Sequence, residues 1–374
     1  MASRYVPTGI PFLRSQNVKP GRLDMNSLAY IDAGFHAELA KSQLEAGDLV
    51  IVRTGVPGVA AIIPEGIGPL NCADLVIARP APGVDAHFLC YAINETAGGF
   101  VRAHTVGAVQ QHFNVASAKR LALNLPSLAE QRAIVEVLGA LDDKITVNER
   151  VAARARELGL TSYSQSLHDD DSVEVVVESV TAALTRGVAP KYTDSSDELT
   201  VLNQKCIRDG RVNLEPSRLT LREKVKAPKM LQLNDVLVNS TGVGTLGRVA
   251  RWTFGLDATV DSHITIVRFN EDKVDPVCAG FAMLRAQPEI EAMGVGSTGQ
   301  TELRRSQVGE LKLTLPGLTG QKELRPKLDA LEERADQALR ESLALADLRD
   351  TLLPQLMSGR LRVRDAERIV EEAV

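Results

Sequence analysis

The segment TGVGTLG, which begins at Thr241, has glycines in the GxGxxG spacing that can hold the pyrophosphate of a dinucleotide. In such a site the glycine turn follows a strand and opens a helix whose N-terminus binds the phosphates. Here the residues RVARWTFGLDATV follow, with β-branched and aromatic residues and no helical face. A similar segment from Thr54, TGVPGVAA, lacks the spacing. Nicotinamide or flavin binding is therefore a weak hypothesis.

Other catalytic signatures are missing from the sequence. It contains no GxxxxGK[ST], GxSxG or HExxH motif, and no [DN]PP[YF] tetrapeptide of the kind found in amino-methyltransferases. The six histidines are scattered, and His112 and His263 are expected to be surface or core residues rather than catalysts. We therefore predict that the chain has no catalytic residues of its own.

Four cysteines stand alone, without CxxC or Cys/His ligand spacing: Cys72, Cys90, Cys206 and Cys278. They predict reduced, buried thiols in a cytoplasmic protein and no metal site. No apolar run approaches the ~20 residues that span a bilayer, and the N-terminus has no signal-peptide core. With 374 residues, the chain is long enough for two or more domains.

The elements that would position a site recur along the chain. IPFLRSQNVKPGRL from Ile10 matches LTVLNQKCIRDGRV from Leu199, and GDLVIVRTG from Gly47 matches NDVLVNSTG from Asn234. LVIARP and ITIVRF, and later LPSLAEQRAIVEVLGALDDKI and LPGLTGQKELRPKLDALEERA, recur at nearly the same offset. A constant offset over such a distance predicts a duplicated unit, each copy a globular part followed by a helical part.

The helical parts have the clearest pattern. Ser127 and Glu130 form a capping box at the start of the first helix. The apolar and small residues that follow recur in heptad spacing in both copies. The first series is Ile134, Leu138, Leu141, Ile145, Asn148, Ala152 and Ala155, and the second is Leu324, Leu328, Leu331, Ala335, Ala338, Ser342 and Leu345. We expect these two seams to pack on each other, although a core-facing stripe in an ordinary helix bundle is an open alternative.

The globular parts contain both strands and short helices. GDLVIVRT, NDVLVNST and ITIVRF predict strands, Pro20-Gly21 and Asp209-Gly210 predict turns, and AHFLCYAINETAG and PVCAGFAMLRAQPEI predict helices. The net charge of −5 is concentrated in the helical parts, and the globular parts are nearly neutral. From Lys205 to Lys229, eight basic residues meet three acidic ones, which suits a phosphate-contacting face but also an ordinary solvated loop.

At full length, the sequence resembles the specificity subunit of Type I restriction-modification systems. The resemblance rests on LPSLAEQRAIVEVLGALDDKI, on its second copy, and on the closing LRDTLLPQLMSGRLRV, because an LPxLxEQ segment opens each spacer helix in that family. It implies an α+β fold of two tandem α/β target-recognition domains separated by two long antiparallel spacer helices. The corresponding ranges are 1–125 and 176–315 for the domains, 126–175 for the central spacer, and 316–374 for the second spacer and tail.

The resemblance also implies a function. Such a subunit is not an enzyme; it reads a bipartite, asymmetric sequence in double-stranded DNA and docks two methyltransferase subunits. Those partners bind S-adenosylmethionine and methylate adenine at N6, and a motor-nuclease subunit can join them. An alternative is a non-catalytic DNA-binding scaffold of the same fold in another defence or regulatory complex. Neighbouring genes for a methyltransferase and a translocase would separate the two.

Base edges and phosphates are bound mostly by Arg, Lys, Asn, Gln, Ser, Thr and His side chains on loops. Equivalent loops in the two copies carry such residues, and each is either a DNA contact or simply a turn or solvated residue. In the first copy they are Arg14, Ser15, Asn17, Arg53, Thr54, Gln110, Gln111, His112 and Asn114. In the second they are Asn203, Gln204, Lys205, Asn239, Ser240, Thr241, Arg248, Gln300, Arg304 and Arg305.

The two copies differ at their starts. The second opens with SVEVVVESVTAALTRGVAP, and the first has no such lead-in before Met1. The segment SGRLRVRDAERIV after Met357 occupies the place that HDDDSVEVVVESV occupies after Leu167. We therefore expect residues 359–370 to fold back and complete the first globular domain, in the role that residues 169–180 have in the second.

Overall fold

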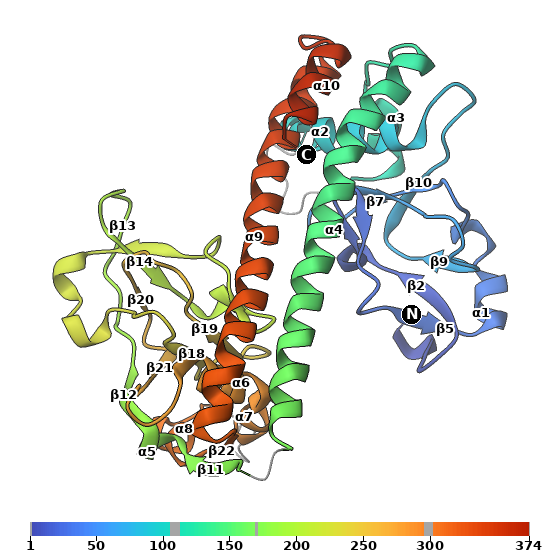
Figure 1. The fold of residues 1–374 in the computed structure, drawn as a ribbon. Coiled ribbons are helices and arrows are strands. Elements are labelled where there is room, and N and C mark those ends of the chain that lie inside the picture. Colours follow the sequence, from blue (N-terminus) through green and yellow to red (C-terminus); the bar gives the residue numbers. More distant parts are fainter. Residues whose placement is uncertain (1, 105–112, 169–170, 295–301, 374) are drawn as a thin grey trace. The chain divides into compact units, whose positions relative to one another are not determined.

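The computed structural model describes residues 2–104, 113–168, 171–294 and 302–373. The chain divides into two compact units (Figure 1). Unit 1 comprises Met1–Asn148 and Arg340–Val374, and unit 2 comprises Glu149–Leu339. Helices and strands are mixed in both, so the predicted α+β class is confirmed. Among the described helices, none combines the length and apolar character needed to cross a membrane.

Unit 1 is built on a five-stranded sheet and a three-stranded sheet. The five-stranded sheet has the order β1 (Tyr5–Val6), β5 (Ala29–Ile31), β2 (Ile10–Leu13), β9 (Leu70–Cys72) and β6 (Gln43–Leu44). The three-stranded sheet has the order β10 (Leu75–Ala78), β7 (Leu49–Val52) and β8 (Ala60–Ile62). A hairpin of β3 (Val18–Lys19) and β4 (Arg22–Leu23) and a short helix, α1 (Ala33–Glu38), complete this part.

Helix α2 (Ala86–His104) covers the three-stranded sheet, because its apolar face carries Cys90, Ile93 and Ala97 toward buried strand residues such as Ile51 and Val76. Phe113, just before α3 (Val115–Arg120), is fully buried in the same cluster. The pattern of residues three to four positions apart is that of an amphipathic helix on a sheet.

Unit 2 has two four-stranded sheets. One has the order β12 (Thr181–Arg186), β21 (Ile264–Phe269), β18 (Val236–Asn239) and β19 (Val249–Arg251). The other has the order β13 (Tyr192–Thr193), β17 (Arg218–Thr220), β14 (Leu199–Leu202) and β20 (Ala258–Val260). Two-stranded pairs are formed by β15 (Ile207–Arg208) with β16 (Arg211–Val212), and by β11 (Val173–Val176) with β22 (Lys312–Leu315).

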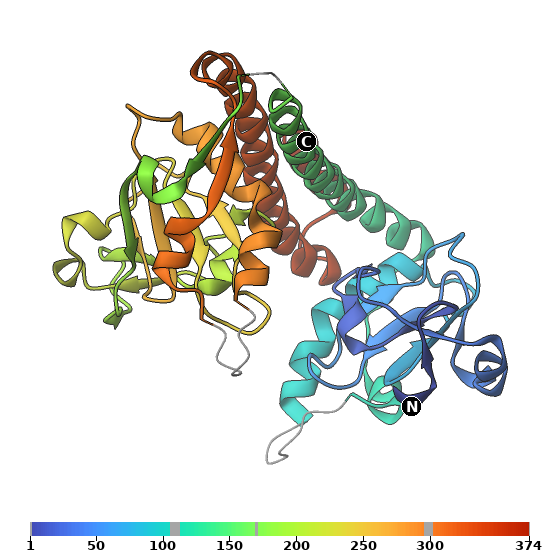
Figure 2. The ribbon, with the colours of Figure 1, turned by 90° about the horizontal axis from the view of Figure 1, so that it is seen from below.

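Short helices complete unit 2. They are α5 (Val177–Val180), α6 (Pro276–Arg285), α7 (Gln287–Met293) and α8 (Arg305–Glu310). Figure 2 shows α6 and α7 against the strands of this unit. Val277 and Phe281 of α6 are buried with Val236 and Val267 of the sheet, so one face of α6 forms part of the core.

The two units have matching strand pairings. β2 and β9 pair in parallel in unit 1, as β14 and β20 do in unit 2. The β3–β4 and β15–β16 turns contain Gly21 and Gly210 at φ +72° and +71°, which is the left-handed region that favours glycine. The predicted turns are therefore present, and the matching pairings support the predicted repeat. The domain boundaries drawn from the sequence stay a prediction.

The units differ at one sheet edge. In unit 2 the strand β21 pairs with β12 on one side and β18 on the other. In unit 1 the corresponding strand β10 pairs with β7, and no strand within the described residues covers its other edge. Strand β12 belongs to the segment SVEVVVESVTAALTRGVAP that opens the second copy.

Two long helices carry the heptad pattern, α4 (Leu128–Ser166) and α9 (Leu318–Met357). Ser127 caps α4, because the Glu130 amide donates to its Oγ at 3.3 Å. In unit 1, Asp142 pairs with Arg349 at 2.7 Å and Lys144 with Glu341 at 3.3 Å. Rising numbers on α4 meet falling numbers on α9, so the two segments are antiparallel there.

The seam residues are buried as the pattern predicts. Leu138, Leu141 and Leu345 belong to one cluster in unit 1. In unit 2, Ala152 and Ala155 meet Ala335 and Ala338 in a second cluster. Alanines on both helices leave little side-chain bulk between the backbones, which permits close packing.

The ends of the seams have a different environment. Ile134 of α4 is buried with Phe88 and Ala92 of α2. Leu324 and Leu328 of α9 are buried in the cluster that contains Phe281 of α6. The seams therefore pack on each other over part of their length, as expected, and near the start of each long helix they form part of a globular core.

A buried glutamine explains the recurring LPxLxEQ-like segment. Gln131 donates to the Pro126 carbonyl at 2.9 Å and accepts from the Asp85 amide at 2.9 Å. Gln321 makes the same contacts with Pro316, at 2.7 Å, and Asp275, at 2.8 Å. Asp85 and Asp275 in turn accept from amide groups in the first turns of α2 and α6. The glutamine thus joins each long helix to the start of a globular-domain helix.

Polar contacts also hold α9 against unit 2. The guanidinium of Arg251 is buried, and it pairs with Glu332 and, at 3.8 Å, with Asp329. Asp336 accepts from Arg211 at 2.9 Å and from Thr253 at 3.1 Å. Burial lowers the pKa of Arg251 to about 10, although nearby carboxylates act in the opposite direction. These side chains fix α9 on the β19 side of the unit.

The C-terminal tail folds back onto unit 1 as helix α10 (Val363–Glu371). Ala366 and Val370, four residues apart, are buried in the cluster that contains Phe88 and Ala92. Residues 359–370 therefore pack on unit 1 as expected, but their expected equivalence to 169–180 is wrong. In unit 2 that region forms β11, paired with β22, and the short helix α5.

Candidate nucleic-acid interface

Three polar residues from separate segments of unit 2 meet beside the loop between β18 and β19. The Gln204 amide donates to the Thr241 carbonyl at 2.7 Å and to the Thr241 hydroxyl. The same hydroxyl lies 2.9 Å from Nδ1 of His263. His263 is exposed, and Gln204 and Thr241 are half-buried. We call Gln204, Thr241 and His263 the second polar cluster.

The corresponding positions of unit 1 also meet. Thr54 Oγ1 donates to a carboxylate oxygen of Asp74 at 3.0 Å, and Ser15 Oγ lies 3.4 Å from the Asp74 carbonyl oxygen. Arg53 is 3.7 Å from the same carboxylate. Asp74 is exposed and has φ 61°, a left-handed conformation that Asp tolerates better than most residues. We call Ser15, Thr54 and Asp74 the first polar cluster.

The two polar clusters have the same architecture and different chemistry. Each cluster has three members: a residue after β2 or β14, a threonine after β7 or β18, and a residue just before β10 or β21. The threonine is the same in both copies, whereas the Ser and Asp of the first correspond to Gln and His in the second. Such groups can donate to or accept from base edges, so the arrangement suits two readers of different sequences.

Sequence reasoning missed one member of each cluster. Asp74 was not selected, and His263 was assigned to the surface or the core. The repeat contains the missing signal, because both residues stand immediately before equivalent strands, β10 and β21.

Three predicted contact residues lie too deep to reach DNA. Asn17, Asn239 and Ser240 have no exposed surface. Asn17 donates to the Asp24 carbonyl at 3.1 Å, and Asn239 donates to the Gln204 and Thr245 carbonyls at 3.0 and 3.1 Å. The prediction that these three residues contact DNA is therefore corrected. They are buried beneath the loops, where their hydrogen bonds stabilise the loop backbone.

Other predicted residues have local structural roles as well. Asn203 and Asn114 each cap a short helix by accepting from amides at 2.9 Å. Arg14 donates to the Ser27 carbonyl at 3.1 Å and lies over the Tyr5 ring. Arg248 donates to the Gly244 carbonyl at 2.7 Å, within the β18–β19 loop. These contacts do not exclude DNA binding, because the side chains keep exposed surface.

The remaining predicted residues divide into two groups. Lys205, Arg304 and Arg305 are exposed, so they can reach a ligand. Four lie outside the described residues: Gln110, Gln111, His112 and Gln300.

A basic cluster in unit 2 was only partly anticipated. Lys229 donates to Thr185 and to the Arg186 carbonyl, and Arg186 pairs with Glu302 at 3.1 Å. Burial lowers the pKa of both Lys229 and Arg186, and the charge of Arg305 lowers each further. Arg305 thus lies close enough to Lys229 and Arg186 to repel both, and an added anion such as a phosphate would offset that repulsion.

The glycines of TGVGTLG serve the loop rather than a dinucleotide fold. Gly242, Gly244 and Gly247 have φ values of +104°, +73° and +79°. The chain continues into strand β19 and not into a helix. The segment therefore lacks the helix N-terminus on which the dinucleotide fingerprint depends.

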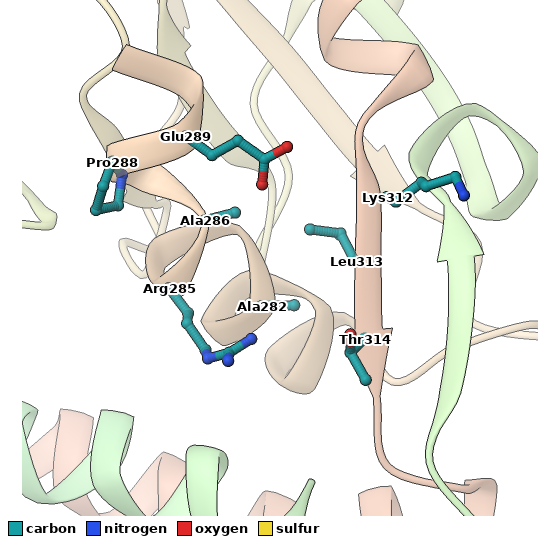
Figure 3. A pocket seen from close by; sticks show the side chains of 8 residues that line it. All are labelled: Ala282, Arg285, Ala286, Pro288, Glu289, Lys312, Leu313 and Thr314. Atoms are coloured by element: carbon teal, nitrogen blue, oxygen red, sulfur yellow. The ribbon is translucent and has the colours of Figure 1, made fainter. Parts of the chain in front are cut away.

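A cavity of about 380 Å³ lies between α6, α7 and β22 in unit 2 (Figure 3). Its charged residues are Arg285, Glu289 and Lys312, and Lys312 pairs with Glu174 of β11 at 2.8 Å. Neither polar cluster contributes to its lining. Its lining contains no His or Cys and no second carboxylate for acid–base work.

The cysteines are buried in the part of the chain that the structure describes. Burial raises the pKa of Cys72, Cys90 and Cys278 to about 12, so these thiols stay protonated at neutral pH. Over the same residues, no group of three His, Cys, Asp or Glu side chains could hold a metal ion.

Comparison with known proteins bears on the fold. No model of a known protein family matches the sequence. A protein of Methanocaldococcus jannaschii with the provisional name type I restriction enzyme MjaX specificity subunit is 21% identical over 388 residues, covering 95% of this chain and 88% of that protein. Over nearly its full length, the chain is thus similar to a protein named as a Type I specificity subunit.

A solved structure agrees with that relationship. The crystal structure of the Type I restriction-modification S subunit from M. genitalium superposes with a TM-score of 0.54 at 16% identity, over 95% of this chain and 91% of that one. A structure from work on assembly of a type I restriction-modification system gives a TM-score of 0.42, which is too low to support an argument. The first of these shows that the Type I S-subunit fold is shared.

Proposed function

We propose that this chain is the DNA-recognition subunit of a Type I restriction-modification complex, acting in the cytoplasm on a bipartite, asymmetric target. The observation that carries the proposal is the pair of polar clusters at equivalent positions of the two units. Each has exposed hydrogen-bonding groups on strand-anchored loops, and their residue types differ. Two readers that share an architecture but present different groups would read two different half-sites.

Phosphate contacts would come from the basic residues near these loops. In unit 2 they are Arg186, Lys229 and Arg305, and exposed Lys205 lies next to Gln204 in sequence. Contacts of this kind position a protein on the duplex without reading its sequence. The slope of log affinity against log salt concentration would then report how many of these residues contact phosphates.

The long helices are the proposed docking site for two methyltransferase subunits. Their outer faces keep large apolar residues exposed: Val147 and Leu343 in unit 1, and Leu158 and Leu318 in unit 2. Single exposed apolar residues do not by themselves mark an interface, so the docking role rests on the similarity to a Type I specificity subunit. The partners would bind S-adenosylmethionine and methylate adenine at N6, and a motor-nuclease subunit could join them. This chain would supply no cofactor site of its own.

The decisive experiment is a methylation assay with purified components. The full chain, a candidate methyltransferase from the same organism, and both together are incubated with radiolabelled S-adenosylmethionine and genomic DNA. We expect label only in the combined reaction, and sequencing of modified bases should show adenine methylation in one bipartite motif. Label incorporated by the chain alone would contradict the proposal. A chain that binds DNA specifically but activates no methyltransferase would favour the scaffold alternative.

A further inference from the structure

Val243 stands fully in solvent at the tip of the β18–β19 loop. Its relative exposure is 99%, the highest among the exposed large hydrophobic residues of the described chain. Gly242 and Gly244 flank it, both at positive φ, and this backbone projects the valine outward. An isolated exposed valine is ordinary on a protein surface, so exposure alone carries no conclusion.

Unit 1 repeats the feature. Val56 is 67% exposed at the corresponding place in the β7–β8 loop. It follows Gly55, at φ +89°, just as Val243 follows Gly242. Both valines lie in a Thr-Gly-Val sequence whose threonine belongs to a polar cluster. The same apolar side chain is thus presented twice, beside polar groups that differ.

The loop tip of unit 2 is held in place. In unit 2, Thr241 is bonded to Gln204 and His263, and Asn239 bonds the Thr245 carbonyl from below. A Cβ at Gly242 would lie 2.3 Å from the Thr245 hydroxyl, so the tight turn requires glycine. An apolar side chain presented from such a turn loses little conformational freedom when it binds.

Among the groups in the major groove, the 5-methyl of thymine is the apolar one, and small apolar side chains contact it. We propose that Val56 and Val243 each contact the 5-methyl group of a thymine, one in each half-site. The inference rests on the proposed function and adds a specificity-determining residue to it. Because the valine is common to both units, both half-sites should contain a thymine beside the loop, whatever the polar clusters read.

Uracil provides the test, because it lacks only the 5-methyl group and keeps the base pairing of thymine. Once the methylated motif is known, duplexes carrying it are made with each thymine replaced singly by uracil. Competition binding is measured with the complete complex of this chain and its methyltransferase. We expect about fourfold weaker binding at one thymine in each half-site, the loss for one buried methyl group.

Substitution of the valines links each effect to its loop. Val243→Ala should weaken binding to the thymine duplex and abolish the thymine-over-uracil preference in one half-site. Val56→Ala should do the same only in the other half-site. Leu233→Ala is the matched control, since Leu233 is 63% exposed in unit 2 and lies outside the loop. It should leave both preferences unchanged.

Several outcomes would overturn the inference while leaving the proposed function intact. One is sequence-specific binding that no uracil substitution alters. Another is a Val243→Ala variant that loses the same affinity for the thymine duplex as for the uracil duplex. That result would mean that the valine separates stacked bases and does not contact the methyl group. A third is a variant that fails to bind the methyltransferase, which would make the valine a protein contact. If the complex showed no sequence-specific binding or methylation at all, the proposed function would fail and the inference with it.

Discussion

Val370 offers a sharp test of the role of the tail in unit 1. Its side chain is 6% exposed and packs in the cluster that contains Phe88 and Ala92 of α2. Val370→Ala removes two methyl groups from this contact, at about 0.8 kcal/mol each, and leaves a small cavity. We therefore expect unit 1 to lose about 2 kcal/mol of stability. A unit of roughly 150–250 residues should then unfold about 4–8 °C lower.

The neighbouring residue supplies the control. Ile369 is 38% exposed on the same helix, so Ile369→Ala should change the stability of unit 1 by less than about 0.5 kcal/mol. The pair separates the burial of one side chain from any general effect on α10.

The only tryptophan of the chain allows the two units to be followed separately. Trp252 is 1% exposed in a core cluster of unit 2, so its fluorescence reports that unit. Hydrogen exchange of α2 amides reports unit 1, and a loss of 2 kcal/mol should speed exchange by about 30-fold where it occurs through unfolding of the unit. The Trp252 transition in urea should not move. Unchanged exchange in α2, or an equal shift of the Trp252 transition, would refute the proposed role of the tail.

Three further predictions concern the helices and the readers. Arg251→Met should destabilise unit 2 by about 3 kcal/mol in Trp252-monitored unfolding, because Glu332 loses its partner, whereas Arg154→Met, at an exposed pair, should cost less than about 0.5 kcal/mol. Equal effects of the two would contradict a structural role for the buried pair. Replacing 176–315 with the corresponding domain of a relative should change one half of the methylated motif, and a change in both halves would show that the readers are coupled. Inserting seven residues after Ala140 and seven after Ala330 keeps the heptad phase and adds ~10 Å to each helix, so the unread gap should lengthen by about three base pairs or activity should be lost. Full activity at the original spacing would mean that the helices do not measure DNA.

The sequence predicts the long helices well, because their order is local. Heptad spacing and the Ser127 cap depend on residues three to seven positions apart, and the buried positions follow from them. The environment of Ile134 and Leu324 could not be read in the same way. Their partners are Phe88 and Phe281, each more than forty residues away, and spacing within one helix does not identify them.

Among the members of the two polar clusters, the sequence predicted Ser15, Thr54, Gln204 and Thr241 but not Asp74 and His263. Those four residues lie on loops after equivalent strands, where polar groups do meet, and their contact with DNA stays a prediction. Composition cannot tell an exposed Asn or Ser from a buried one, so Asn239 and Ser240 were selected although they lie beneath the loop. His263 and Asp74 were missed for the opposite reason: nothing local marks them, and only tertiary pairing places them beside Thr241 and Thr54.

The polar clusters have exposed members, whereas the residues that support their loops are buried. This division also bears on how such a chain can evolve. Thr54 and Thr241 are the same residue in the two copies, whereas their neighbours Asp74 and His263 differ and are exposed. Substitutions at exposed positions usually change stability by no more than about 0.5 kcal/mol. Variation can therefore accumulate where the chain would meet DNA without unfolding the domain that holds it. New specificities could arise by point mutation, half a target at a time, on a frame that does not change.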